Sequence, residues 1–142
     1  MNTIEAENKA VLIIDSELPT GIIANTAAIL GITLGHKHQC IIGEDITDAS
    51  NQSHLGITNI PIPVLKGTKS LIKELLAEVK SKYRNDVTVI DFSKTAQLST
   101  DYDDYTLKAK NLASDEFEYL GIGIYGPKKI LNKLTGSIAL LR

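Results

Sequence analysis

The sequence predicts a single α/β domain over residues 1–142, with three layers in which helices cover both faces of a mixed central β-sheet. Two observations support this fold class. Short apolar runs typical of buried strands alternate along the chain with helical segments. The chain has 142 residues, of which 43% are hydrophobic, so it can build one core of ordinary size, and its length favours one domain.

The start of the chain predicts a strand followed by a helix. Residues 9–15 (KAVLIID) are a continuous apolar run that ends in an acid, which is typical of a strand buried on both faces in the middle of a sheet. Residues 16–20 supply turn and cap residues. We expect the helix that follows to end near Gly31 or Gly35.

The next segment is predicted to leave the body of the domain. Residues 39–43 suit a short strand, but residues 44–59 are polar and poorly periodic, so we expect an excursion or hairpin over residues 36–60. Residues 60–65 (IPIPVL) alternate, and their two prolines lack the N–H of a regular ladder. They predict an edge strand or one end of a strand.

The clearest helix in the sequence covers residues 68–83, where apolar residues recur on one face. The β-branched run at residues 87–92 (VTVIDF) predicts another strand. Residues 101–118 hold six acids and two lysines and suit a helix or an ordered loop, so they form an acidic flank.

The last part of the chain repeats the pattern of strand and helix. Residues 119–125 (YLGIGIY) predict an apolar strand, and Pro127 opens a short helix that runs to Leu134. Residues 137–141 (SIALL) predict a final strand.

Composition argues against several classes of function. A formal charge of -2 argues against a protein that binds double-stranded nucleic acid. Only 5% of the residues are aromatic and none is Trp, so few rings are available to stack on the bases of single-stranded nucleic acid. The longest apolar stretch, residues 21–35, is shorter than the roughly 20 residues of a membrane-spanning helix. No targeting segment is expected, and the single Cys40 cannot form an internal disulfide, so the expected location is cytoplasmic.

No metal or cofactor is predicted. His36 and His38 would share a face only on a strand, and zinc sites need three or four ligands. The sequence has no GxGxxG or P-loop pattern, and a nucleophile pair of Cys40 with a histidine lacks a third orienting group. Asp15, at the end of the first strand, either caps the following turn or faces a ligand.

The first predicted helix is apolar nearly all round. Small residues line one side of it, namely Ala24, Ala28, Gly31 and Gly35. Two interpretations of Asn25 stay open: an amide bonded to a neighbouring loop, or an amide that orients a ligand at a pocket mouth. A helix this apolar also predicts that a second subunit covers its outer side, so we expect a homodimer in which this helix forms the interface.

The helix that begins at Pro127 is a second candidate site. Its free N–H groups lie at the end of the preceding strand, where an anion can be held. From Gly126 to Arg142 there are four cations and no acids, which leaves room for a weak, salt-sensitive RNA contact. The alternative is a solvated helix face that ends at Gly136.

Two long segments resemble the type-II peptidyl-tRNA hydrolases. Residues 119–141 resemble their C-terminal signature, in which an LGIGPGP strand leads into a helix and a DKVTGHLKLY-like end. Residues 9–28 resemble their first strand and LKMGKGKIAAQ-type helix start, and residues 96–98 are similar to the segment around their DAGRTQ motif. The whole chain is also similar to an uncharacterised bacterial family, a domain of unknown function grouped with those hydrolases by fold. The resemblance implies a peptidyl-tRNA hydrolase II-like fold and a dimer.

The residues that carry the hydrolases' chemistry are not matched. Residues 22–24 (IIA) cover the stretch where the resemblance implies a catalytic lysine. When Gln97 is aligned with the glutamine of DAGRTQ, Phe92 stands at the position of the aspartate and Ala96 at that of the threonine. Asp91 precedes the aspartate position by one residue, so in a strand its carboxylate would point to the opposite face of the sheet.

The sequence therefore favours a divergent member of this fold with a pocket for a small polar or anionic ligand. Amides, hydroxyls and one lysine would form it: Asn25, Gln97, Tyr125, Lys129, Asn132 and Thr135. Two alternatives stay open. One is an enzyme that still hydrolyses peptidyl-tRNA with the substitute residues Asp91, Lys94 and Thr95, and the other is a dimeric structural or interaction module.

Overall fold

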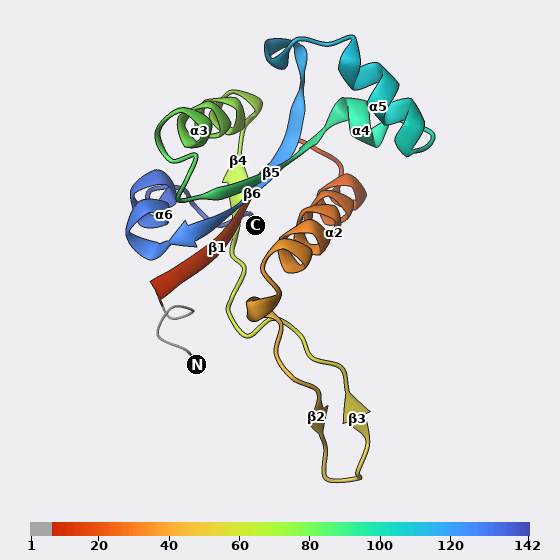
Figure 1. The fold of residues 1–142 in the computed structure, drawn as a ribbon, viewed down its shortest axis with the longest axis vertical. Helices are drawn as coiled ribbons and strands as arrows, with labels where there is room; N and C mark the ends of the chain where they lie inside the picture. The colour runs from red at the N-terminus through yellow and green to blue at the C-terminus, as the bar shows by residue number, and fades with distance from the viewer. Residues whose placement is uncertain (1–6) are drawn as a thin grey trace.

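The computed structural model describes residues 7–142 and contains a four-stranded mixed sheet in the order β4-β1-β6-β5 (Figure 1). The strands are β1 (Asn8–Asp15), β4 (Val64–Gly67), β5 (Thr88–Ser93) and β6 (Tyr119–Pro127). β1 pairs in parallel with β4, whereas β6 runs antiparallel to both β1 and β5. The predicted mixed sheet and the central position of the first strand are confirmed.

Helices cover both faces of this sheet, as predicted. α3 (Lys69–Lys82) and α6 (Lys128–Thr135) lie on one face, and α2 (Thr20–Lys37) lies on the other (Figure 1). The core under α3 and α6 contains buried strand and helix residues, among them Val11, Ile13, Ile72, Leu76, Ile122, Ile124 and Leu131. The core under α2 contains Leu12, Leu30, Phe92 and Leu120. Apolar residues on both faces of β1 explain its unbroken apolar sequence.

A glycine of β6 lets α2 lie close to the sheet. A Cβ atom added at Gly121 would come within 2.8 Å of the Thr26 Cγ2 atom of α2, whereas one added at Gly123 would meet Leu12 of β1 at 3.1 Å and Leu30 of α2 only at 3.7 Å. The helix therefore packs on nearly bare backbone, and Thr26 and Leu30 are fully buried beneath it.

The first helix, predicted to end near Gly31 or Gly35, continues to Lys37, two residues past Gly35. No glycine has a positive φ in residues 7–142, so neither of these two forms a left-handed cap. The C-cap is His38, whose N–H donates to the Leu34 carbonyl at 2.9 Å.

The strand predicted at residues 39–43 is absent, and a short 3₁₀ helix, η1 (Gln39–Ile41), stands there. Residues 42–59 then form a hairpin arm that projects away from the sheet (Figure 1). It contains β2 (Ile46–Thr47) and β3 (Ser53–His54), which pair antiparallel. The chain turns out into the arm at η1, and Ile42 reaches only a single bridge, to Thr58.

The strand predicted at residues 60–65 is reduced to its last two residues and continues through Gly67 as β4, at the edge of the sheet. Its prolines explain the late start, because they have no N–H to donate. Pro63 contributes only its carbonyl, which accepts from the Leu12 N–H at 2.9 Å.

The strand predicted at residues 137–141 is also not regular. Leu140 forms an isolated bridge to Leu65, the Lys66 N–H donates to the Ala139 carbonyl at 2.8 Å, and the Leu141 N–H donates to the Val64 carbonyl at 2.9 Å. The segment therefore covers the outer edge of β4 without a full ladder. Within residues 7–142, no helix combines the length and the apolar character that crossing a membrane requires.

Candidate functional site

Three strands terminate at the same end of the sheet, and β6 begins at that end. β1 ends at Asp15, β4 at Gly67 and β5 at Ser93, and β6 begins at Tyr119. β1, β4 and β5 run in the same direction, because β5 and β1 are both antiparallel to β6. In α/β proteins the carboxyl ends of such strands are the usual place for a ligand.

Charged side chains link these strand ends. Glu118, just before β6, forms ion pairs with Lys69 at the start of α3 and, at 3.6 Å, with Lys94 at the start of α4 (Lys94–Gln97). The two lysines, Lys69 more than Lys94, hold the pKa of Glu118 below its usual range. Glu118 in turn raises the pKa of Lys69, with a smaller contribution from the charge of Asp15.

Asp15 is a buried acid at this edge, with 1% of its surface exposed. Its Oδ1 atom accepts a hydrogen bond from the Glu17 N–H at 3.0 Å, which fixes the turn after β1. Its Oδ2 atom has no hydrogen-bond partner in the described part of the chain. The turn-capping interpretation of Asp15 therefore accounts for one oxygen, and the other remains an unused buried acceptor.

Beside Lys94 the surface carries an open groove of about 490 Å³. Its walls come from α4, α5 (Tyr102–Lys110), the 3₁₀ helix η2 (Ser114–Glu116) and Glu118 just before β6. Polar and apolar residues line it together: Lys94, Thr95, Leu98, Lys108, Asn111, Leu112, Glu116 and Glu118. Both its volume and its mixed lining are typical of sites for small molecules.

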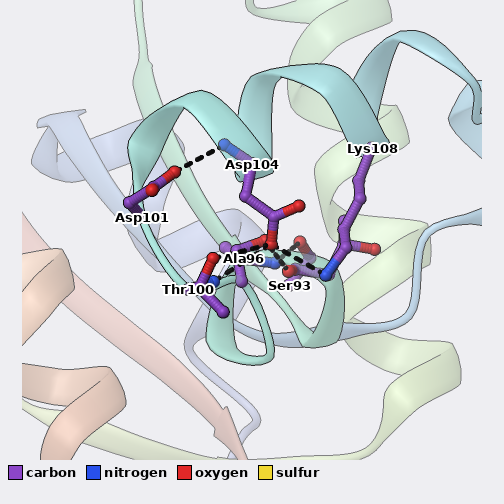
Figure 2. A network of polar contacts seen from close by, with 8 residues as sticks. Ser93, Ala96, Thr100, Asp101, Asp104 and Lys108 are labelled. Atoms are coloured by element: carbon purple, nitrogen blue, oxygen red, sulfur yellow. Dashed lines mark hydrogen bonds and ion pairs between the residues drawn. The ribbon is translucent and has the colours of Figure 1, made fainter.

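Helix caps fix the walls of the groove. The Ser93 Oγ atom accepts from the Ala96 N–H at 3.3 Å and caps α4, and the Asp101 Oδ1 atom accepts from the Asp104 N–H at 2.7 Å and caps α5 (Figure 2). Asp104 is also the centre of a small network, because its Oδ2 atom accepts from the Thr100 N–H at 3.0 Å and pairs with Lys108 at 3.0 Å (Figure 2). These contacts place Lys108 at the groove.

The charges that line the groove balance. Lys94 and Lys108 face Glu116 and Glu118, and the Thr100 amide, followed by Lys108, holds the pKa of Asp104 below its usual range. The side chains of Lys94 and Lys108 are 58% and 45% exposed, so their ammonium groups remain hydrated beside their carboxylate partners. Each ammonium group is therefore accessible from solvent without a change in the core.

The three substitute catalytic residues do not line one cavity. Lys94 and Thr95 line the groove, whereas Asp91 contributes to the wall of a second cavity of about 360 Å³ beside Tyr105. Burial raises the pKa of Asp91, and the positive charge of Lys80 opposes this shift.

The six residues predicted to form one ligand pocket are not brought together, because the sheet separates them. Asn25 is exposed on α2, and Tyr125 packs on the same side of the sheet. Gln97 is half-buried on α4. Lys129, Asn132 and Thr135 belong to α6, on the opposite face (Figure 1).

Two of the α6 residues already have partners in the described chain. The Asn132 Oδ1 atom accepts from the Lys9 ammonium group at 2.9 Å. The buried Thr135 hydroxyl donates to the Leu131 carbonyl at 2.7 Å within its own helix. The first contact joins α6 to β1, and the second lies within α6.

Tyr125 belongs to a separate cluster at the other end of β6. Its ring lies 4.0 Å from the ring of His38, centroid to centroid, and its hydroxyl is 3.9 Å from the Cys40 Sγ atom. The His38 Nε2 atom is 2.9 Å from the Thr88 hydroxyl, and burial lowers the pKa of His38. The His38 side chain therefore anchors the end of α2 to β5 and β6.

The three histidines lie apart. His36 is exposed, His38 is packed on Tyr125, and His54 pairs with Asp48 at 2.8 Å in the arm. Between Glu7 and Arg142, no three residues of the types His, Cys, Asp and Glu gather closely enough to hold a metal ion.

Several groove residues were missed from the sequence because they lie in the segment interpreted only as an acidic flank. These are Lys108, Asn111, Glu116 and Glu118. A usable signal was the position of Glu118 directly before one strand and of Lys94 directly after another. That signal could be used only with the knowledge that the end of β5 and the start of β6 are neighbours. The structure shows that they are, because the Lys94 N–H donates to the Glu118 carbonyl at 2.9 Å.

Comparison with known proteins identifies relatives of the whole domain. None of the curated proteins matches the chain. A solved structure of a protein of unknown function from Agrobacterium tumefaciens strain C58 is similar over 94% of this chain and 97% of that one, with a TM-score of 0.84 and 17% sequence identity. That likeness concerns the fold. The family model of proteins of unknown function DUF2000 matches residues 8–142, from the start of β1 to the end of the chain, and the protein therefore belongs to this family.

Proposed function

We propose that the protein is a divergent member of the peptidyl-tRNA hydrolase II-like fold that binds a small polar ligand carrying an anionic group. The binding site in this proposal is the groove between α4 and α5. The observation that carries it is the groove of about 490 Å³ at the strand ends, with the hydrated ammonium groups of Lys94 and Lys108 on its walls.

The lining defines the chemistry of the ligand. Lys94 and Lys108 suit a carboxylate or a phosphate, because charge-assisted hydrogen bonds from ammonium groups are the strong ones. Glu116 and Glu118 suit N–H or O–H donors on the same molecule, and Leu98 lies beside them for a small apolar group. A ligand with an anionic end next to hydrogen-bond donors, such as an acylated amino acid, matches this lining.

The placement of the two resembling segments supports the fold assignment. Residues 9–28 fold into β1 and the start of α2, and residues 119–141 fold into β6 and α6. These segments lie far apart in sequence, yet β1 and β6 are neighbours over seven residue pairs from Asn8 to Ile14. The resemblance thus covers a contiguous half of the sheet.

Titration of ¹⁵N-labelled protein with inorganic phosphate and with N-acetylalanine tests the proposal by NMR. We expect the amide shifts of residues 94–118 to move with one of these probes. Lys94→Ala and Lys108→Ala should each weaken binding at least tenfold, because a charge-assisted contact is worth about 1.5–3 kcal/mol. Lys129→Ala is the matched control, since it removes a surface lysine of α6 on the other face of the sheet. If neither probe moves the groove amides at millimolar concentration, the assignment is wrong.

A second candidate function is hydrolysis of the ester bond of peptidyl-tRNA with Asp91, Lys94 and Thr95 as substitutes. Its support is the position of Lys94 and Thr95 on the groove wall and the raised pKa of Asp91, which lines the second cavity and not the groove. Purified protein would turn over peptidyl-tRNA, and Asp91→Asn and Lys94→Ala would abolish turnover while the fold is kept. Absence of turnover at high enzyme concentration removes this candidate.

A further inference from the structure

The arm carries large apolar side chains that nothing in the described chain covers. Ile46, Leu55 and Ile57 are 66%, 81% and 80% exposed. The arm is also acidic, because it contains Glu44, Asp45 and Asp48, and residues 38–65 include no Lys or Arg. An apolar and acidic surface is suited to a partner that is apolar and basic.

Specific hydrogen bonds hold the arm in shape. The Asp48 Oδ1 atom accepts from the N–H groups of Ser50 and Gln52 at 2.8 and 3.0 Å, which closes the tip. Near the base, the Gly43 N–H donates to the Ile57 carbonyl at 2.7 Å, and the Asp45 side chain accepts from the Gly56 N–H at 2.8 Å. An ordered arm with uncovered apolar residues is typical of an interaction surface.

The outer face of α2 has the complementary character. From Thr20 to Gly35 the helix contains no charged residue, and Ala24, Ala28 and Ile32 are exposed on it, Ile32 at 74%. Its C-terminal end carries the basic residues His36 and Lys37. Small residues leave shallow space on this face for the bulky side chains of an arm.

The arm cannot serve the α2 of its own chain, because it leaves from the C-terminal end of α2 and points away from it (Figure 1). The lengths, however, match. The 18 residues of α2 span about 27 Å, and the eight residues from Gly43 to the tip at Ser50 span about 26 Å when extended. A two-fold axis near the base of the arm would therefore lay each arm along the α2 of the other copy.

We propose that a second copy of this chain covers these surfaces, in a dimer where each arm docks on the outer face of the partner's α2. Ile46, Leu55 and Ile57 pack on the small residues and on Ile32, and the acidic base of the arm lies beside the basic end of the helix. The two contacts are equivalent, as a two-fold interface requires. This proposal is independent of the groove, because α4 and α5, which line the groove, lie at the opposite end of the sheet from the base of the arm (Figure 1).

Size-exclusion chromatography with light scattering tests the assembly. We expect the wild-type protein to have twice the 15.4 kDa mass of the chain. Leu55→Asp on the arm and Ile32→Asp on α2 should each raise the dimer dissociation constant at least tenfold. Leu107→Asp, at a 63% exposed leucine of α5, is the matched control and should remain dimeric. A monomeric wild-type protein overturns the proposal.

Mixing the two variants separates arm docking from direct packing of α2 on α2. A heterodimer of Leu55→Asp with Ile32→Asp keeps one intact contact, between the arm of the second chain and the α2 of the first. We therefore expect differently tagged variants to pair with each other more strongly than either pairs with itself. If Leu55→Asp alone stays dimeric, the arm is not part of the interface.

Charge reversal tests the basic end of α2. Lys37→Glu and Glu44→Lys should each weaken the dimer several-fold, and the double variant should recover the wild-type dissociation constant, because both contacts regain opposite charges. Both residues are exposed, so neither change affects the core. Failure of the double variant to recover would contradict the docking register.

Discussion

Asp91 shows how one side chain is set by its surroundings. It lies half-buried on β5, and burial raises its pKa above the ordinary value of 3.8, with Lys80 opposing the shift. Because the folded protein holds this proton more tightly than the unfolded chain, the free energy of unfolding falls as the pH rises from below 3.8 through the folded pKa. At neutral pH the charged form costs stability.

Asp91→Asn is therefore expected to stabilise the protein at pH 7, since the amide has nearly the same shape and no charge to bury. The gain in the free energy of unfolding should shrink as the pH falls and vanish below 3.8. Urea unfolding at a series of pH values measures this, with Asp86→Asn, at an exposed acid, as the control. Equal stability of wild type and Asp91→Asn at pH 7 would contradict the argument from burial.

Gly121 is a second residue whose identity the packing dictates. Gly121→Ala places a methyl group 2.8 Å from the Thr26 Cγ2 atom and 3.1 Å from the Ile13 carbonyl oxygen, so we expect a loss of about 1–3 kcal/mol in unfolding free energy. Gly31→Ala is the matched change, because nothing lies within 4 Å of its new Cβ atom, and a helix interior gains up to about 1 kcal/mol from alanine. Urea denaturation of both variants should give shifts of opposite sign.

Distance along the sequence does not decide which residues meet at the candidate site. Tyr125 and Lys129 are four positions apart in sequence, but the chain passes from β6 into α6 between them, so they lie on opposite faces of the sheet. Lys94 and Glu118 are distant in sequence, yet their strand ends adjoin. The resemblance to the hydrolases suggested Lys94 and Thr95, but only the strand order brings in Glu118.

At the scale of elements, strong periodicity predicts well. The apolar stripe placed α3 to within one residue at each end, and the continuous apolar runs located β1 and β6. Strand predictions were wrong where the local sequence resembles a strand but the fold supplies no neighbouring strand to pair with it. Residues 39–43 and 137–141 have strand-like composition, but each finds at most an isolated bridge.

The start of α3 allows an element to be tested through its cap. The Thr68 Oγ1 atom accepts from the Leu71 N–H at 3.1 Å, and no acid in the first turn assists it. Thr68→Ala should lower the free energy of unfolding by about 1 kcal/mol, whereas Thr68→Ser keeps the hydroxyl and should lose much less. Thermal unfolding followed by circular dichroism compares the two, and equal losses would rule out the cap as the cause.

The C-terminal residues cover one edge of the sheet. Residues 139–141 run along the outer edge of β4. Strand edges with free N–H and carbonyl groups are prone to pair with other molecules. The last residues thus protect an edge that the short β4 would otherwise expose.

Truncation after Gly136 tests this role. It removes the hydrogen bonds from the Lys66 N–H and to the Val64 carbonyl together with the half-buried Ile138, so we expect a loss of roughly 2–4 kcal/mol in the free energy of unfolding. Removal of Arg142 alone, an exposed residue beyond those bonds, is the control and should change little. Urea unfolding at one fixed protein concentration gives the comparison, because association contributes to apparent stability. The truncated chain should also self-associate more than the wild-type protein as its concentration rises. Unchanged stability with no new association would mean that the β4 edge needs no cover.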